Sequence, residues 1–197
     1  MFQRLCLFIY QIIISPICWK YKYKVAVGYI LSIILGNMTV VYFGLINLFG
    51  LTFPAGALFI GLTFSMRDLV QREWNHMVWV FIIISTFITA ILGLLLPNTL
   101  PVSAEIVALA SASAFIISEG IDWLVYTILK KNIIWRISIS NIFSTPIDSM
   151  IFVGIIFGNY NLLSPPVYGQ TIIKYLSGLL IIPIIIIRKR KLNLQEK

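Results

Sequence analysis

Four acidic residues lie in or beside long apolar segments, where ionisable side chains are rare. Glu119, Asp122 and Asp148 are inside such segments, and Asp68 is at the end of another. A carboxylate in lipid costs several kcal/mol unless it is paired or takes up a proton. Residues of this kind therefore usually face the interior of a helix bundle and mark the path of a ligand or an ion.

The rest of the chain offers little other chemistry. It has seven Asp plus Glu residues, one His and two Cys among 197 positions. Cys6 and Cys18 form no Cys-x-x-Cys pair and His76 stands alone, so we predict no metal site. The phosphate-binding pattern Gly-x(4)-Gly-Lys-Ser/Thr is absent, so we predict no ATP site and no other cofactor.

The composition indicates a polytopic membrane protein, with the lipid bilayer as its principal surroundings. Hydrophobic residues make up 59% of the chain and charged residues 11%, less than half of the roughly 25% charge of a soluble domain. The formal net charge is +8, from 15 Lys plus Arg against seven Asp plus Glu. The basic residues are confined to a few junctions, so we interpret them as topology signals and not as a nucleic-acid surface.

Six apolar segments could each cross the hydrocarbon core, which takes about 20 residues of helix. The predicted segments are 25–47, 53–70, 77–96, 102–129, 133–157 and 171–187. Pro54 would stand in the first turn of the second segment, where proline is tolerated. The predicted fold class is therefore an all-α bundle of six transmembrane helices.

Basic residues mark alternate junctions between these segments. The basic clusters are Lys20, Lys22 and Lys24; Arg67 and Arg72; Lys130, Lys131 and Arg136; and the run 188–191. The other junctions, 48–52, 98–101 and 158–170, contain neither Lys nor Arg. With six crossings every cluster falls on one side, so the positive-inside rule predicts a multi-pass inner-membrane protein with both termini in the cytoplasm.

The transmembrane domain covers residues 25–187, between an N-terminal extension (1–24) and a basic cytoplasmic tail (188–197). The apolar stretch 5–18 in the extension is short and contains Gln11 and Pro16. We favour an interfacial or packed helix there over a seventh crossing, which would place the N-terminus outside. The sequence leaves open whether the protein works alone or as a homo-oligomer.

Three polar side chains are predicted at a similar depth in the bilayer. Asn37, Glu119 and Asp148 each lie roughly 16–20 Å from the nearest basic cluster, at about 1.5 Å per helical residue. The centre of the hydrocarbon core lies about 15 Å from its edge. We expect no cationic partner at this depth, because Arg67 and the other basic residues are placed near the cytoplasmic face.

Helical spacing gathers the polar residues on two faces. Residues three or four apart share a face, so Glu119, Asp122 and Tyr126 line one face of segment 102–129. In segment 133–157 the corresponding face carries Asn141, Thr145 and Asp148. We predict that these two faces oppose each other around a polar cavity.

Two pairs of residues admit two interpretations each. Asn37 and Asn141 could bind a ligand, or they could hydrogen-bond a neighbouring helix as polar side chains in membrane helices often do. Arg67 and Asp68 could extend to the cytoplasmic interface, or they could bind a ligand or form a gate.

Buried carboxylates suit a particular kind of ligand. A carboxylate accepts two parallel hydrogen bonds from an N–H/NH2 edge, such as the Watson–Crick edge of a guanine-type base. Phe64, Trp123 and Phe143 could stack on a flat ligand, although packing is the commoner role of such aromatic residues. Proton or cation transport is the other common use of intramembrane carboxylates.

Four runs of sequence resemble the VUT family, which comprises queuosine-precursor transporters. The runs are Phe-Pro-Ala-Gly at 53–56, Leu-Thr-Phe-Ser-Met-Arg-Asp-Leu-Val-Gln-Arg at 62–72, Ser-Glu-Gly-Ile-Asp-Trp-Leu-Val-Tyr-Thr at 118–127 and Ser-Asn-Ile-Phe-Ser-Thr-Pro-Ile-Asp-Ser-Met-Ile-Phe at 140–152. The resemblance covers about residues 25–187. It implies a six-helix inner-membrane importer of 7-deazaguanines such as preQ0 and preQ1.

The resemblance also implies a set of substrate-binding residues. Transferred by matching motif, these residues are Asn37, Arg67, Asp68, Glu119, Asp122, Asn141 and Asp148. Glu119 and Asp148 would accept hydrogen bonds from the base, and Asn37 and Asn141 would support them. The sequence departs from the family pattern at Gly120 and at Pro146, and Pro146 is expected to kink its helix.

Three other functions explain the sequence less well than a transporter does. A vitamin-type substrate-binding subunit that depends on an ATP-driven coupling module fits the size, but the first segment lacks an Ala-x-x-x-Ala docking face. An intramembrane enzyme is not expected, because Gly-x-Gly-Asp and any Ser/His or Cys/His set at membrane depth are absent. A non-transporting assembly factor would leave the converging carboxylates unexplained.

Overall fold

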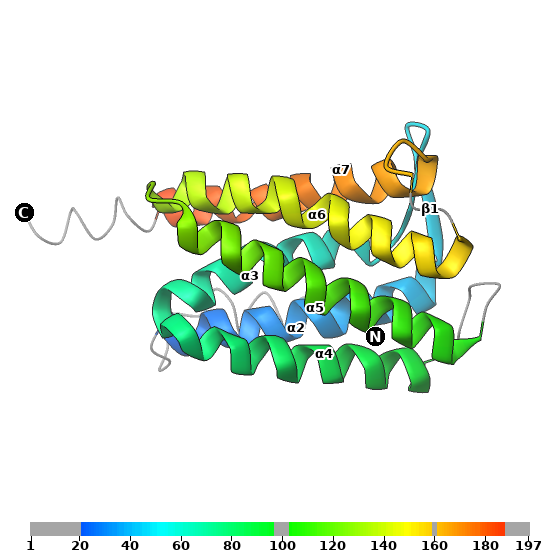
Figure 1. Ribbon diagram of the computed structural model, residues 1–197, viewed down its shortest axis with the longest axis horizontal. Coiled ribbons are helices and arrows are strands. Elements are labelled where there is room, and N and C mark those ends of the chain that lie inside the picture. The colour runs from blue at the N-terminus through cyan, green and yellow to red at the C-terminus, as the bar shows by residue number, and fades with distance from the viewer. Residues whose placement is uncertain (1–20, 97–102, 159–160, 188–197) are drawn as a thin grey trace, which may run out of the picture.

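The computed structural model describes residues 21–96, 103–158 and 161–187, and for Tyr21 and Lys22 it describes the backbone alone. The predictions for residues 5–18 and for the tail 188–197 therefore lie outside the described residues. Six α-helices form an antiparallel bundle (Figure 1). They are α2 (Tyr21–Phe43), α3 (Ala57–Trp74), α4 (Val78–Leu95), α5 (Ala104–Ile128), α6 (Ile133–Phe157) and α7 (Pro165–Leu179).

Five stretches of the described chain are long and apolar enough to cross a membrane. One of them, Ala57–Leu95, is 39 residues long, which would be roughly 58 Å as a straight helix. It comprises α3, the 3-10 turn η1 (Asn75–Met77) and α4. The chain reverses direction at η1 (Figure 1), so this stretch consists of two antiparallel helices.

A β-hairpin joins α2 to α3, where the sequence predicted only a short junction between two helices. Strands β1 (Leu45–Leu48) and β2 (Leu51–Pro54) pair antiparallel. The predicted first helix extended to residue 47, but α2 ends at Phe43, before Gly44 at φ +60°. Pro54 consequently ends a strand and does not lie in the first turn of a helix.

The turn of this hairpin depends on left-handed backbone conformations. Phe49 has φ +52° and Gly50 has φ +77°, as in a two-residue type I′ turn, whose two central residues both have positive φ. The turn aligns Leu48 with Leu51. Glycine is favoured at such a position because other residues suffer a steric clash between Cβ and the backbone.

Gly50→Ala should lower the free energy of unfolding by about 1 kcal/mol, because alanine at positive φ is strained. Thermal unfolding of the purified protein in detergent would measure this as a lower Tm. Gly120→Ala is the matched control, because an added Cβ there meets nothing closer than Trp79 at 3.7 Å. A Tm for Gly50→Ala equal to or above that of Gly120→Ala would contradict the conformational argument.

The last helix begins earlier than predicted and is interrupted. We predicted a helix over 171–187, but α7 begins at Pro165, and proline is favoured in the first turn. The helix breaks at Leu180 and resumes over 181–187. Pro183 accounts for the break, because it has no N–H to donate to the carbonyl of Leu179.

The bundle is apolar outside and polar inside, the reverse of a soluble helical protein. Large apolar side chains on the outer faces are about half exposed or more, among them Phe87, Leu124 and Phe143. The buried charged or amide side chains are Arg67, Asp68, Gln71, Glu119, Asp122, Asn141, Asp148, Gln170 and Lys174. This distribution is typical of a bundle surrounded by lipid.

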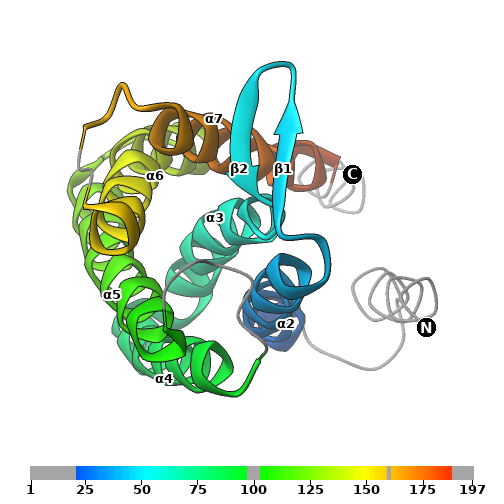
Figure 2. The same cartoon turned by 90° about the vertical axis from the view of Figure 1, so that its right-hand side faces the viewer.

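The two ends of the bundle differ in charge. The hairpin lies at one end, which we call the hairpin end (Figure 1). The opposite end, which we call the basic end, carries Lys24, Arg72, Lys130, Lys131 and Arg136 at or near helix termini. Seen from the hairpin end (Figure 2), α3 lies within a ring of helices, and it contacts each of the other five.

Candidate functional site

A fully buried arginine organises the half of the bundle toward the basic end. The Arg67 side chain is 0% exposed, and its Nε donates to Glu119 Oε2 at 2.9 Å. Its Nη2 lies 2.9 Å from Asp68 Oδ1 and also contacts Asp122 Oδ2. We call these four residues the Arg67 cluster, in which three carboxyl groups share one guanidinium.

Hydrogen bonds extend the cluster across three helices. Arg67 Nη1 donates to Gln71 Oε1 at 2.5 Å, and Gln71 Nε2 donates to Thr127 Oγ1 at 2.8 Å. Ser140 Oγ donates to Asp68 Oδ2 at 3.0 Å. Helix α3 is thereby tied to α5 and α6 by buried polar contacts, which are costly to break when one partner is removed.

A second arginine fastens α5 to α6 nearer the basic end. The guanidinium carbon of Arg136 lies 3.7 Å from the centroid of the Tyr126 ring, within the range of a cation–π interaction. Arg136 Nε also donates to the backbone carbonyl of Tyr126 at 2.9 Å. These two contacts join α5 to α6 near the basic end.

The structure decides between the two interpretations of Arg67 and Asp68 and contradicts one prediction about charge. Neither side chain extends to the interface, since both are 0% exposed. Helix α3 continues to Trp74, so Arg67 lies about two turns from its end and points into the bundle. The expectation that no cation shares the depth of Glu119 and Asp148 is wrong, because Arg67 pairs with Glu119 and Lys174 with Asp148.

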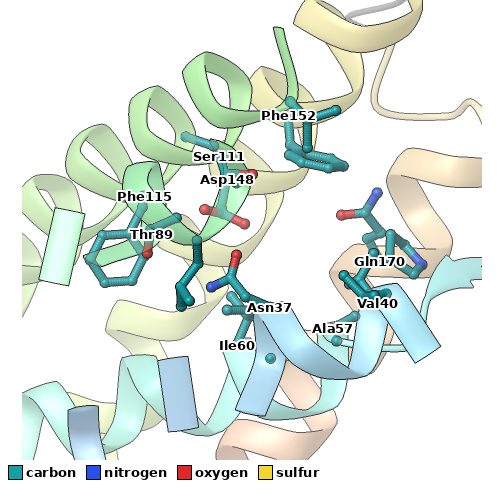
Figure 3. Close-up of a pocket in the computed structure, with 18 of the residues that line it drawn as sticks. Asn37, Val40, Ala57, Ile60, Thr89, Ser111, Phe115, Asp148, Phe152 and Gln170 are labelled. Atoms are coloured by element: carbon teal, nitrogen blue, oxygen red, sulfur yellow. The ribbon is translucent and has the colours of Figure 1, made fainter. Parts of the chain in front are cut away.

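A cavity lies between the Arg67 cluster and the hairpin end (Figure 3). All six helices contribute to its wall, together with Pro54 of β2. Its polar lining residues are Asn37, Thr89, Ser111, Asp148, Gln170 and Lys174. Its volume is about 110 Å³, roughly seven to eleven times the space that one water molecule needs. None of the four residues of the Arg67 cluster lines it.

Asp148 and Lys174 form a buried ion pair in the cavity wall. Lys174 Nζ donates to Asp148 Oδ2 at 2.6 Å, and each side chain is 5% exposed. Nζ also donates to Gln170 Oε1 at 2.8 Å and to Ser149 Oγ at 3.4 Å. Ser118 Oγ donates to Asp148 Oδ1 at 3.0 Å, so the carboxylate is held from both α5 and α7.

Other polar groups of the cavity remain available to a ligand. Asn37 Nδ2 donates to the carbonyl of Ile33 at 2.9 Å, which leaves its Oδ1 as an acceptor. Thr89 Oγ1 is buried and has no hydrogen-bond partner among the described residues. The side chains of Asn37 and Asp148 both point into the cavity, and Phe115 and Phe152 lie on its wall (Figure 3).

The structure thus divides the predicted site residues into three groups. Asn37 and Asp148 line the cavity. Arg67, Asp68, Glu119 and Asp122 form the Arg67 cluster. Asn141 belongs to neither, because its Nδ2 donates to Ser65 Oγ at 2.8 Å where α3, α6 and α7 meet, as in the helix-contact interpretation.

Several residues that line the cavity are not among those predicted from the sequence. Lys174 is an ionisable residue within an apolar segment, so the rule that selected Asp148 could also have selected it. Gln170 is one turn before it on α7, which begins earlier than predicted. Nothing in the sequence around Phe115 and Phe152 distinguishes them, as cavity-lining residues, from the other aromatic residues. Conversely, the proposed stacking residues Phe64, Trp123 and Phe143 do not line the cavity.

A family model described as "Putative vitamin uptake transporter" matches residues 54–188, which is more than half of the chain. The protein belongs to this family. The match includes the whole Arg67 cluster and both members of the Asp148–Lys174 pair, whereas Asn37 lies before it. No curated protein and no solved structure matches the chain.

Membership identifies this chain as a vitamin uptake transporter-family protein of the membrane, in agreement with its apolar helices. It confirms the resemblance to the VUT family at the level of the family.

Proposed function

We propose that this vitamin uptake transporter-family protein imports 7-deazaguanine precursors of queuosine, such as preQ0 and preQ1, across the cell's inner membrane. The observation that carries the proposal is the combination of Asp148, Asn37 and Gln170 in one cavity. These three side chains supply hydrogen-bond acceptors and donors suited to one edge of a guanine-type base. The resemblance of the sequence to queuosine-precursor transporters favours this base over other flat heterocycles.

The hydrogen-bonding pattern of the cavity complements the base. A guanine-type edge presents adjacent N–H and NH2 donors beside a carbonyl acceptor. The Asp148 carboxylate has about four acceptor positions, of which Ser118 and Lys174 use two. Asn37 Oδ1 adds a further acceptor, and Gln170 Nε2 can donate to the carbonyl because Gln170 Oε1 already accepts from Lys174.

The apolar part of the cavity suits a flat ring of this size. Phe115 and Phe152 lie on different helices of its wall, and aromatic rings pack favourably against flat heterocycles. The cavity is small, at about 110 Å³, which favours a compact flat ligand over a bulky one. In this proposal Gln170 takes the role that we expected of Glu119 and Asn141 at the base.

The Arg67 cluster is proposed to close the pathway on the cytoplasmic side. We infer that the six helices each cross the membrane and that the basic end faces the cytoplasm, by the positive-inside rule. The cavity then lies on the outer side of the cluster, and the cluster joins α3, α5 and α6 between it and the cytoplasm. Import requires these contacts to separate.

Uptake of labelled preQ0 and preQ1 by cells that lack precursor synthesis would test the function, with queuosine in tRNA as the second readout. Cells expressing the protein should accumulate label and modify tRNA, and cells with the empty vector should not. A panel of unlabelled vitamins added as competitors tests the wider family description. Expression in a host without ATP-driven coupling modules separates a self-sufficient importer from a subunit that needs one.

A covalent link across the Arg67 cluster should block import without preventing binding. Gln71→Cys and Thr127→Cys would be joined through two disulfide bonds by a short bis-methanethiosulfonate reagent, in a background of Cys6→Ser and Cys18→Ser. Because these residues bridge α3 and α5, we expect uptake to fall at least ten-fold and to recover on reduction. Each single-cysteine variant, treated identically, is the control. Undiminished uptake by the linked protein would refute a closure at this position.

A further inference from the structure

Lys174 makes the cavity electrically neutral. Among the described residues that line it, Asp148 and Lys174 are the two that carry charge. They pair at 2.6 Å and are nearly inaccessible to solvent. A ligand entering this site therefore meets a carboxylate whose charge is already balanced by a tethered ammonium.

The ammonium of Lys174 is also fully engaged. Its three N–H groups correspond to three acceptors, namely Asp148 Oδ2, Gln170 Oε1 and Ser149 Oγ. All three acceptors belong to neighbouring parts of α6 and α7, so the head group is held in one place. Because Lys174 is part of the same chain, its effective concentration at Asp148 greatly exceeds that of a free amine.

These observations point to a selection on the charge of the ligand. A ligand bearing its own ammonium would bring a second positive charge to a site with one carboxylate, in surroundings that weaken electrostatics far less than water does. It could pair with Asp148 only by displacing Lys174, whose charge would then be buried without a partner. An uncharged ligand incurs neither cost, since it can accept or donate hydrogen bonds while the ion pair stays intact.

We propose that Lys174 is a specificity-determining residue, because of which the cavity binds the uncharged base in preference to the form that carries a cationic aminomethyl group. The inference rests on the proposed function. Of the two precursors, preQ0 carries a neutral nitrile at the 7 position, whereas preQ1 carries an aminomethyl group that is cationic at neutral pH. The protein should therefore prefer preQ0 to preQ1.

Equilibrium binding of preQ0 and preQ1 to the purified full-length protein in lipid nanodiscs tests this preference. We expect wild-type protein to bind preQ0 at least ten-fold more tightly than preQ1. Lys174→Met removes the ammonium and leaves Asp148 free to pair with the aminomethyl group. The affinity for preQ1 should therefore rise at least ten-fold relative to the affinity for preQ0. Lys174→Gln, which keeps a polar side chain, provides a second variant in case the first does not fold.

The controls separate this inference from the function on which it rests. Lys131→Met removes an exposed lysine at the basic end and should leave the ratio unchanged. A wild-type ratio below three, or a ratio that both Lys174 variants leave unchanged, would overturn the role of Lys174. If neither precursor binds wild-type protein, the proposed function itself fails, and that result is distinct from binding with the wrong preference.

Discussion

Asp148→Ala should reduce uptake of preQ0 at least a hundred-fold and should also destabilise the protein. The change removes the principal acceptor of the cavity and leaves the Lys174 ammonium buried without its partner. Breaking a buried ion pair by removing one member typically costs about 3–5 kcal/mol. Initial rates of uptake, corrected for the amount of protein in the membrane, and thermal unfolding in detergent would measure the two effects.

A double variant separates the two consequences of losing Asp148. Asp148→Ala combined with Lys174→Met removes both charges, and replacing a whole buried pair by apolar groups is often neutral for stability. The double variant should recover most of the Tm but none of the uptake. Glu105→Ala, at an exposed acidic residue of α5, is the control for charge alone. Substantial uptake by the double variant would show that the carboxylate does not bind the substrate.

Arg67→Ala should have the largest effect on stability of any single substitution considered. It leaves the carboxyl groups of Asp68, Glu119 and Asp122 buried together without the guanidinium that they share. The expected loss is at least about 3–5 kcal/mol, measured as a lower Tm and a smaller yield of folded protein. Uptake should fall because less folded protein is present. Uptake per molecule of folded protein should fall as well, because the closure is also disrupted.

Two comparisons make the Arg67 result interpretable. Arg67→Lys keeps the charge but loses the planar fork that serves several acceptors at once, so an intermediate Tm is expected. Arg72→Ala removes an exposed arginine from the same helix and should change stability by less than about 0.5 kcal/mol. Equal Tm values for Arg67→Ala and Arg72→Ala would mean that the cluster does not hold the bundle together.

The helices and their inner faces could be predicted because each depends on local pattern. Apolar runs of sufficient length located six helices, and the three- and four-residue spacing correctly placed Glu119, Asp122 and Tyr126 on a buried face. The same spacing correctly predicted that Asn141 and Asp148 are buried. These features follow from the helical period alone, whichever neighbours surround the helix.

The features that were missed depend on partners or on unusual local chemistry. Arg67 was read as an end-of-helix residue because apolar character stops near Val70, although the helix itself continues to Trp74. The hairpin was not predicted, because Phe49-Gly50 is not one of the residue pairs that are common in type I′ turns, such as Asn-Gly. The pairing of Lys174 with Asp148 joins α7 to α6, and helical spacing within one segment cannot reveal such a contact.

The position of α3 limits how the protein can move. This one helix carries Ala57 and Ile60 at the cavity and Arg67 and Gln71 at the opposite closure. At its cavity end, Gly61 packs so closely against the backbone of α7 that an added Cβ would overlap the carbonyl oxygen of Lys174. Because the cavity wall and the closure share this helix, a rigid-body displacement of α3 would move both together. Release of the closure is therefore coupled to the shape of the cavity.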